Sequence, residues 1–266
     1  MKKNWKIVLY ISIVCTIFAM AIHTLWAPLY DYYPPSFFVI YNLFKPFAAL
    51  SLLVTFFLLG IVFVYIQKDL LGAKISKGIR YGITFGGLWF IAMPGTSLLF
   101  HSPLKHELVS GMCDALSILL LGFLLGKFVA TDTHTTHHKK KSYLLPIVII
   151  GFIYCVGRYA AYRLFGIELA YTDNLSSTLL WTGALGIWFG ITYILLRQSV
   201  EKYMPIEKAL MFGGSIVGID WILFNLFAVL FIRISALLLI TQAMVDIVLV
   251  ILGIFVYERY LQKIHP

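Results

Sequence analysis

The chain has 266 residues, of which 61% are hydrophobic and only 12% are charged, and its formal net charge is +9. This composition excludes an ordinary soluble domain, in which about a quarter of the residues are charged. The basic residues flank apolar blocks and form no contiguous patch. The positive charge therefore indicates membrane topology and argues against a nucleic-acid-binding protein.

Apolar blocks of about 20 residues, the length at which a helix crosses a bilayer, follow one another along the chain. We place eight of them at Ile7–Leu29, Phe47–Ile66, Tyr81–Phe100, Leu108–Phe128, Tyr143–Tyr162, Leu175–Leu196, Ala209–Ile232 and Ile234–Tyr257. The first block is long and has no clear cleavage pattern, so we expect a retained helix and not a signal peptide. The sequence predicts an all-α, polytopic membrane helix bundle embedded in a lipid bilayer.

Lysine and arginine are distributed unequally between the two sides of these spans. Sixteen lie on the side of the two termini and five on the other side. Because basic loops stay in the cytoplasm, this bias predicts that both termini are cytoplasmic, and the eight-span arrangement fits a multi-pass protein of the cell membrane.

The stretches 77–127 and 209–259 match each other at an offset of 132 residues. The pairs brought together are Gly82 with Gly214, Gly86 with Gly218, Trp89 with Trp221 and Asp114 with Asp246. We interpret this as an internal duplication, with a first four-helix repeat at 1–130, a polar linker at 131–142 and a second four-helix repeat at 143–266. Four helices per repeat is an even number, so the repeats should be parallel and meet at a central interface.

Histidines are the remaining candidates for metal or haem ligands. The linker has His134, His137 and His138 at a spacing that suits a metal on a helix, but its threonines and lysines favour a solvated segment. His23, His101 and His106 fall near the outer surface, and His101 and His106 have no counterpart in the second repeat. Since paired haem ligands belong on facing helices, we expect no cofactor and no metal.

The first repeat resembles a family of small bacterial membrane proteins with four predicted helices and no settled function. The resemblance lies in Gly78-Ile79-Arg80-Tyr81-Gly82, in Met93-Pro94-Gly95-Thr96, and in a turn at Pro103 that leads to Asp114. It covers about residues 1–130, and it implies four helices per unit but no activity. The second repeat departs from the pattern, because Leu226 stands where the first has Pro94.

Asp114 and Asp246 are the strongest functional candidates. Each lies about ten residues into its helix, near mid-membrane, where an aspartate costs about 2.5–3.5 kcal/mol on insertion scales. One interpretation is that both line a pathway and bind a cation or a proton. The other is that each accepts hydrogen bonds from neighbouring helices and holds the bundle together. A carboxyl group buried without a cation can also remain neutral.

Further polar residues break the symmetry of the two repeats. Asp220 lies mid-helix where the first repeat has Leu88, and Asn225 follows on an adjoining face, so the two could contact a substrate. Arg158 lies inside the outer half of the fifth span. It could snorkel to the interface, bind an anion or a lipid headgroup, or form an ion pair with Asp246 or Asp220.

The glycines and one proline are expected to determine helix shape. The pairs Gly82/Gly86, Gly122/Gly126, Gly186/Gly190 and Gly214/Gly218 have the G-x-x-x-G spacing that lets helix backbones approach closely in lipid. Pro94 should kink the third span because it removes a backbone donor.

Three function classes follow from these observations. The favoured one is a transporter or channel-like protein for a small solute, an ion or a lipid. The alternative is a non-catalytic scaffold that packs against a membrane partner or another copy of itself. The least favoured is an integral membrane enzyme acting on a lipid or quinone through His101, His106, Glu107 and Arg158, since the second repeat lacks the histidines. The sequence also has no Walker A, G-x-S-x-G or H-E-x-x-H motif.

Overall fold

The computed structural model describes residues 2–27, 32–133, 144–167 and 174–264, and these residues form helices joined by short connections. Eight helical segments are long and apolar enough to cross a membrane, which confirms the multi-pass all-α class. Their elements are α1 (Lys2–Trp26), α3 (Phe44–Ile66), α4 (Lys74–Ala92) with α5 (Pro94–Phe100), α6 (Leu104–Phe128), α7 (Leu144–Phe165), α9 (Leu175–Leu196) with η1 (Arg197–Val200), α10 (Pro205–Ala209) with η2 (Leu210–Val217), α11 (Gly218–Phe227) and η3 (Ala228–Leu230), and α12 (Ala236–Ile264). A short helix, α2 (Phe37–Ile40), lies between α1 and α3.

The helices extend beyond the apolar blocks at their charged ends. The third span begins at Lys74 and not at Tyr81, and the last helix ends at Ile264 and not at Tyr257. Hydropathy marks only the part of a helix that faces hydrocarbon, whereas backbone hydrogen bonds continue past it. Of the predicted linker, only Thr131–Thr133 is among the described residues, and Thr133 forms an isolated bridge with Gly72. His134, His137 and His138 lie outside the described residues.

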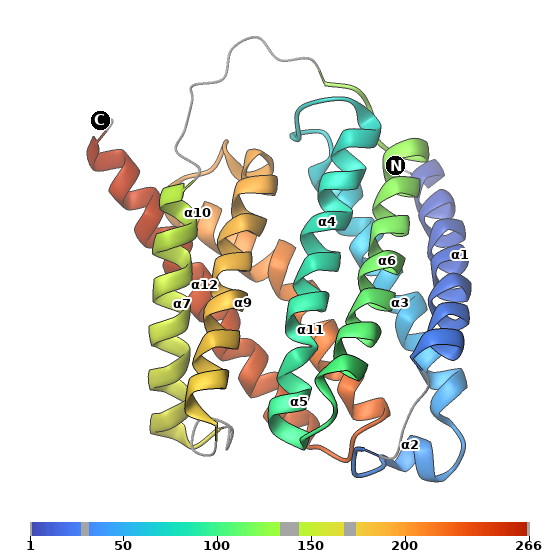
Figure 1. The fold of residues 1–266 in the computed structure, drawn as a ribbon. Coiled ribbons are helices and arrows are strands. Elements are labelled where there is room, and N and C mark those ends of the chain that lie inside the picture. Colours follow the sequence, from blue (N-terminus) through green and yellow to red (C-terminus); the bar gives the residue numbers. More distant parts are fainter. Residues whose placement is uncertain (1, 28–31, 134–143, 168–173, 265–266) are drawn as a thin grey trace.

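The helices form two adjacent groups (Figure 1). The group containing α1, α3, α4 and α6 lies beside the pair α7 and α9, while α12 crosses the bundle obliquely. Helix α4 packs along α6, and α7 packs along α9 and α12. Helix α4 of the first group contacts α9 of the second, and α3 contacts α11, which belongs to the later part of the chain. Helix α1 begins and α12 ends at the same end of the bundle.

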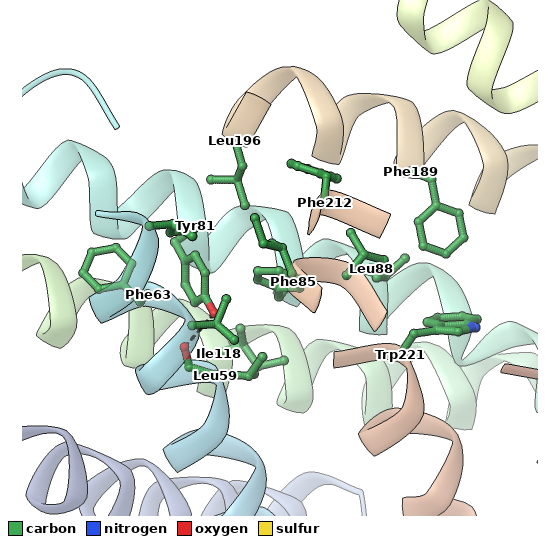
Figure 2. Packing of buried hydrophobic residues seen from close by; sticks show 14 of the residues in the cluster. Leu59, Phe63, Tyr81, Phe85, Leu88, Ile118, Phe189, Leu196, Phe212 and Trp221 are labelled. Carbon is green, nitrogen blue, oxygen red and sulfur yellow. Dashed lines mark hydrogen bonds between the residues drawn. The ribbon is translucent and has the colours of Figure 1, made fainter. Parts of the chain in front are cut away.

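One buried core joins both parts of the chain (Figure 2). It contains Tyr81, Phe85 and Leu88 of α4 together with Phe189 of α9 and Phe212 of η2. Because lipid is as apolar as these side chains, the association of the helices depends on close packing and not on the exclusion of water.

Glycines bring α4 and α6 into backbone contact. A Cβ added to Gly78 would lie 2.1 Å from the carbonyl oxygen of Gly122, and one added to Gly82 would lie 2.9 Å from Cα of Leu119. Gly186 meets the backbone of Gly151 in the same way, at 2.8 Å. These glycines are therefore packing positions, as the G-x-x-x-G spacing predicts.

Gly214 departs from this prediction. A Cβ added there would meet only the Ile251 side chain, at 3.8 Å, whereas one added to Gly213 would lie 3.1 Å from the Ile251 backbone nitrogen. The segment η2 is a π-helix, which winds with one extra residue per hydrogen-bonded turn. This winding turns Gly213 toward α12 in the place where the sequence offset expects Gly214.

A short antiparallel contact connects the segment between α1 and α2 with the segment between η3 and α12. Pro35 forms an isolated bridge with Ile232. The amide of Ser36 donates to the carbonyl oxygen of Phe231 at 3.3 Å, and the amide of Arg233 donates to that of Pro34 at 2.8 Å. These bonds hold together loops that lie almost 200 residues apart in sequence.

Candidate functional site

A cavity of about 430 Å³ lies in the end of the bundle opposite the start of α1. Its walls come from both groups of helices and are mainly apolar and aromatic, with Trp89, Trp181, Trp221 and Phe224 among them. Its polar wall residues are few and include His23, Asp114, Arg158, Asn225 and Gln242. Such a mixture is typical of a site that accommodates a small, largely apolar ligand and orients it by a few polar groups.

Asp114 reaches this cavity and pairs with a histidine. The Nε2 atom of His23 on α1 lies 3.0 Å from Oδ1 of Asp114 on α6. The side chains are 30% and 12% exposed, so both are open to the cavity. This pair is the one acid–base contact, among the described residues that line the cavity, whose acid and base both face the space.

Asp246 belongs to a second, closed polar centre. Nε of Arg158 on α7 donates to its Oδ1 at 2.9 Å, and Nε1 of Trp221 donates to its Oδ2 at 3.1 Å. The side chains of Arg158 and Asp246 are only 5% and 2% exposed. The Arg158 guanidinium also lies over the rings of Tyr162 and Trp181, at 4.3 and 4.7 Å from their centroids. Both carboxylate oxygens therefore have strong donors.

Within the described part of the chain, Asp220 is neither open to the cavity nor part of an ion pair. Its side chain is fully buried, and its Oδ1 accepts a hydrogen bond of 2.9 Å from Nε1 of Trp89 on α4. Its Oδ2 has no hydrogen-bond partner among the described residues. The alternative pairing of Arg158 with Asp220 is therefore wrong, because the guanidinium binds Asp246 instead.

The predicted pathway residues divide into two groups. Asp114, Arg158 and Asn225 line the cavity, whereas Asp246 and Asp220 are not among the described residues that line it. Asn225 donates to the carbonyl oxygen of Trp221 at 2.8 Å, so part of its polar capacity is used within α11. The two duplicated aspartates do not meet across the cavity; each is engaged by a separate helix.

The interruption at Pro94 contributes to one wall. Helix α4 ends at Ala92 and α5 begins at Pro94. Next to this break, Nε1 of Trp181 on α9 donates to the carbonyl oxygen of Ile91 at 2.8 Å. A Cβ added to Gly95 would lie 2.4 Å from the Trp181 ring. The kink and the glycine together provide space for a tryptophan of the other helix group.

A hydrogen-bonded cluster around one buried acid, Glu107, adjoins the cavity through Tyr33. Glu107 is fully buried and accepts hydrogen bonds from the hydroxyl of Tyr33 and, at 2.5 Å, from that of Ser102. Burial, together with the hydrogen bond to Glu107, raises the pKa of Tyr33. Tyr33 lines the cavity, and its ring packs against those of Phe100 and Phe231.

Only two of the four residues proposed for an outer enzyme site are among the described residues that line this cavity. His106 and Arg158 line the cavity, but His101 and Glu107 are not among its described lining residues. Within the described ranges, no group of three or more His, Cys, Asp or Glu side chains is placed to hold a metal ion.

Two functional contacts were missed by the sequence analysis. The partner of Asp114 is His23, and the partner of Asp220 is Trp89. A signal existed for the first: Arg158 and His23 are 135 residues apart, three more than the offset of 132, so a shifted alignment of the first helices would have paired them.

Comparison of the chain with protein-family models, with curated proteins and with solved structures gave no match. The function must therefore be argued from the cavity itself.

Proposed function

We propose that this protein is a transporter that takes a small amphipathic solute or a lipid into the cavity between two parallel four-helix repeats. The observation that carries the proposal is the cavity of about 430 Å³, whose walls come from both parts of the chain and hold the exposed His23–Asp114 pair. A scaffold does not require such a cavity, since in lipid its helices would be stabilised by the closer packing that fills it.

Reciprocal contacts support two repeats. In each proposed repeat the fourth helix carries an aspartate that binds a basic residue of the first helix, His23 with Asp114 and Arg158 with Asp246. Between the repeats, the third helix of each contacts the second helix of the other, α4 with α9 and α11 with α3. This reciprocity is what a two-fold axis along the membrane normal would produce.

The orientation that we propose follows from charge. The start of α1 and the end of α12 lie at the same end of the bundle, and the sequence assigns sixteen of the lysines and arginines to that side. The positive-inside rule places this side in the cytoplasm, so the cavity lies in the outer half of a bacterial cytoplasmic membrane.

The walls define the kind of solute. Aromatic rings dominate, so most of the ligand should be apolar, and the exposed His23–Asp114 pair suits one polar or charged group. Arg158 is balanced by Asp246, whereas Lys45 of the wall has no ion-pair partner among the described residues, so a ligand with an anionic group is also accommodated.

The test is uptake by proteoliposomes. The probes are a radiolabelled short-chain fatty acid, an aromatic amine and an aromatic alcohol, and a fluorescent phospholipid is followed separately for transfer between leaflets. We expect at least one probe to move faster than in protein-free liposomes. Asp114→Asn should slow that movement about 10-fold or more, since a hydrogen bond to a charged group contributes about 1.5–3 kcal/mol.

Asp69→Asn is the matched control, because Asp69 makes an exposed ion pair with Lys202 far from the cavity. Equal uptake by both variants, or no movement of any probe, would overturn the transport proposal. The second result would favour a scaffold, for which the engagement of Asp114, Asp220 and Asp246 by neighbouring helices is the supporting observation.

A further inference from the structure

Asp220 is a buried acid that neither the wall of the cavity nor the two acid–base pairs use. It comes from α11, at the contact of that helix with α4, and its side chain has no exposed surface. The only donor that reaches it among the described residues is the neutral indole of Trp89, and its Oδ2 is without a partner.

The charged and titratable groups around Asp220 do not neutralise it. On α4 the titratable side chain that interacts electrostatically with Asp220 is the phenol of Tyr81. On α12, Asp246 is already paired with Arg158. Helix α3 carries Lys45 in the cavity wall near its outer end and Tyr65 near its cytoplasmic end, bonded to Tyr203. η2 and η3 contain no titratable side chain.

An ionised carboxylate in such surroundings would lack both water and a counter-ion, which is costly enough that a buried acid binds a proton instead. A metal ion does not fit the same place. Ca²⁺ and Mg²⁺ require about six oxygen ligands, whereas the donor that faces Oδ1 is an N–H group.

Trp89 separates this acid from the cavity. Its ring lines the cavity, packs edge-on against Phe224 at a centroid distance of 5.1 Å, and directs its N–H away from the space toward Asp220.

We propose that Asp220 is a proton-binding site of the transporter and that Trp89 controls its access to the cavity. In the closed arrangement the carboxyl group holds the proton on Oδ2. When the indole moves, the proton passes from Oδ2 to a water molecule of the cavity, the O–H bond breaks, and a carboxylate and a hydronium ion are formed. Uptake in the reverse direction restores the acid. The coupling of this step to solute movement rests on the proposed function.

The protonation state is tested without any transport assay. Infrared spectra of the full chain in lipid, at about neutral pH, should contain the C=O stretch of a protonated carboxyl group that disappears in Asp220→Asn. Asp220→Leu should lose the same band and remain folded, because Leu88 occupies the corresponding position of the first repeat. Asp69→Asn should change no band of this kind. A spectrum in which neither Asp220 variant removes a protonated-carboxyl band overturns the proposal.

The role of Trp89 is tested by exchange into D2O. The band of Asp220 should shift as its proton is replaced, and Trp89→Phe should accelerate the shift at least several-fold. Trp188→Phe is the control, since Trp188 also lies between helices but donates to the carbonyl oxygen of Thr84. A band that never exchanges, or one whose exchange is the same in both variants, contradicts the control of access by Trp89.

Coupling is then measured with whichever probe moves. In proteoliposomes with an imposed pH gradient, Asp220→Asn should lose at least most of the gradient-driven acceleration while retaining movement down the solute gradient. Unchanged acceleration overturns the coupling. If no probe moves at all while the infrared band behaves as expected, the proposed transport fails but the proton site stands.

Discussion

The two acid–base pairs of this bundle are built from corresponding helices but are placed in different surroundings. His23–Asp114 faces the cavity, with side chains 30% and 12% exposed, whereas Arg158–Asp246 is 5% and 2% exposed and is completed by Trp221. A buried ion pair is retained only when both partners are satisfied. The comparison teaches that one pair holds the bundle together while the other remains available to a ligand.

The tryptophans differ between the two pairs. Trp221 donates to Asp246, whereas Trp89 donates to Asp220. Among the described residues, Asp246 therefore has an indole donor in addition to its basic partner, and the hydrogen-bond partner of Asp114 is His23.

The largest effect is expected for the closed pair. Arg158→Met leaves Asp246 as an unpaired buried charge, so the free energy of unfolding should fall by about 3–5 kcal/mol. Thermal unfolding in detergent measures the loss. Adding Asp246→Leu to this variant should restore most of the stability, and a double variant as unstable as the single one would show that the effect is not due to the orphaned charge.

His23→Gln is the counterpart in the open pair. Water in the cavity can solvate Asp114, so we expect the free energy of unfolding to fall by only about 1 kcal/mol. Equal destabilisation by the His23 and Arg158 variants would remove the distinction between the two pairs.

The next effect compares corresponding glycines. Gly82→Ala forces a Cβ against the Leu119 backbone and should destabilise the protein by about 1–3 kcal/mol, the usual effect of overpacking. Gly214→Ala meets only a side-chain atom at 3.8 Å, so it should change the stability by no more than about 0.5 kcal/mol. Thermal unfolding of the two variants side by side tests whether the π-helix has shifted the packing register.

Tyr33→Phe tests the hydrogen-bonded cluster around Glu107. This substitution removes one of the two hydroxyl groups that donate to Glu107, so the free energy of unfolding should fall by about 1–2 kcal/mol near neutral pH. The pKa of Tyr33 is raised on folding by burial and by Glu107, so its stabilising contribution is complete below the ordinary tyrosine pKa of about 10 and declines as the pH rises above it. The wild type should therefore lose more stability than Tyr33→Phe above about pH 10, as thermal unfolding across pH would reveal. Parallel pH curves would contradict this assignment.

The smallest effect is expected where the connection after α3 meets the connection after η1. Nζ of Lys202 lies 2.9 Å from Asp69, and this hydrogen bond raises the pKa of Lys202. The side chains are 54% and 35% exposed, and such surface pairs contribute about 0.2–1 kcal/mol. Asp69→Asn should therefore be almost neutral in thermal unfolding, and still more so at high salt. A loss as large as that of Gly82→Ala would mean that this loop contact, and not the helix interface, holds the parts together.

The sequence predicts the membrane spans well, because they depend on the local cost of placing a residue in hydrocarbon. It also offers Asp246 as one of two partners for Arg158. The choice between Asp246 and Asp220 depends on which helix faces α7, and that is a property of the assembled bundle.

The remaining features arise from packing between distant segments. The contact of Trp89 with Asp220 requires α4 to meet α11, which no pattern within either helix encodes. His23 was overlooked because the first helices align only with a shift of three residues. The displacement of Gly214 by Gly213 follows from π-helical hydrogen bonding, for which the glycine spacing gives no indication.

The antiparallel contact between residues 34–36 and 230–233 fastens the connection between α1 and α3 to the turn before α12. Its two amide hydrogen bonds, with a third from the Ser36 hydroxyl to the carbonyl oxygen of Leu230 at 2.6 Å, must break before these two segments can separate. The amide protons of Ser36 and Arg233 are thus natural reporters of that separation, because their exchange with solvent counts the events in which these bonds break.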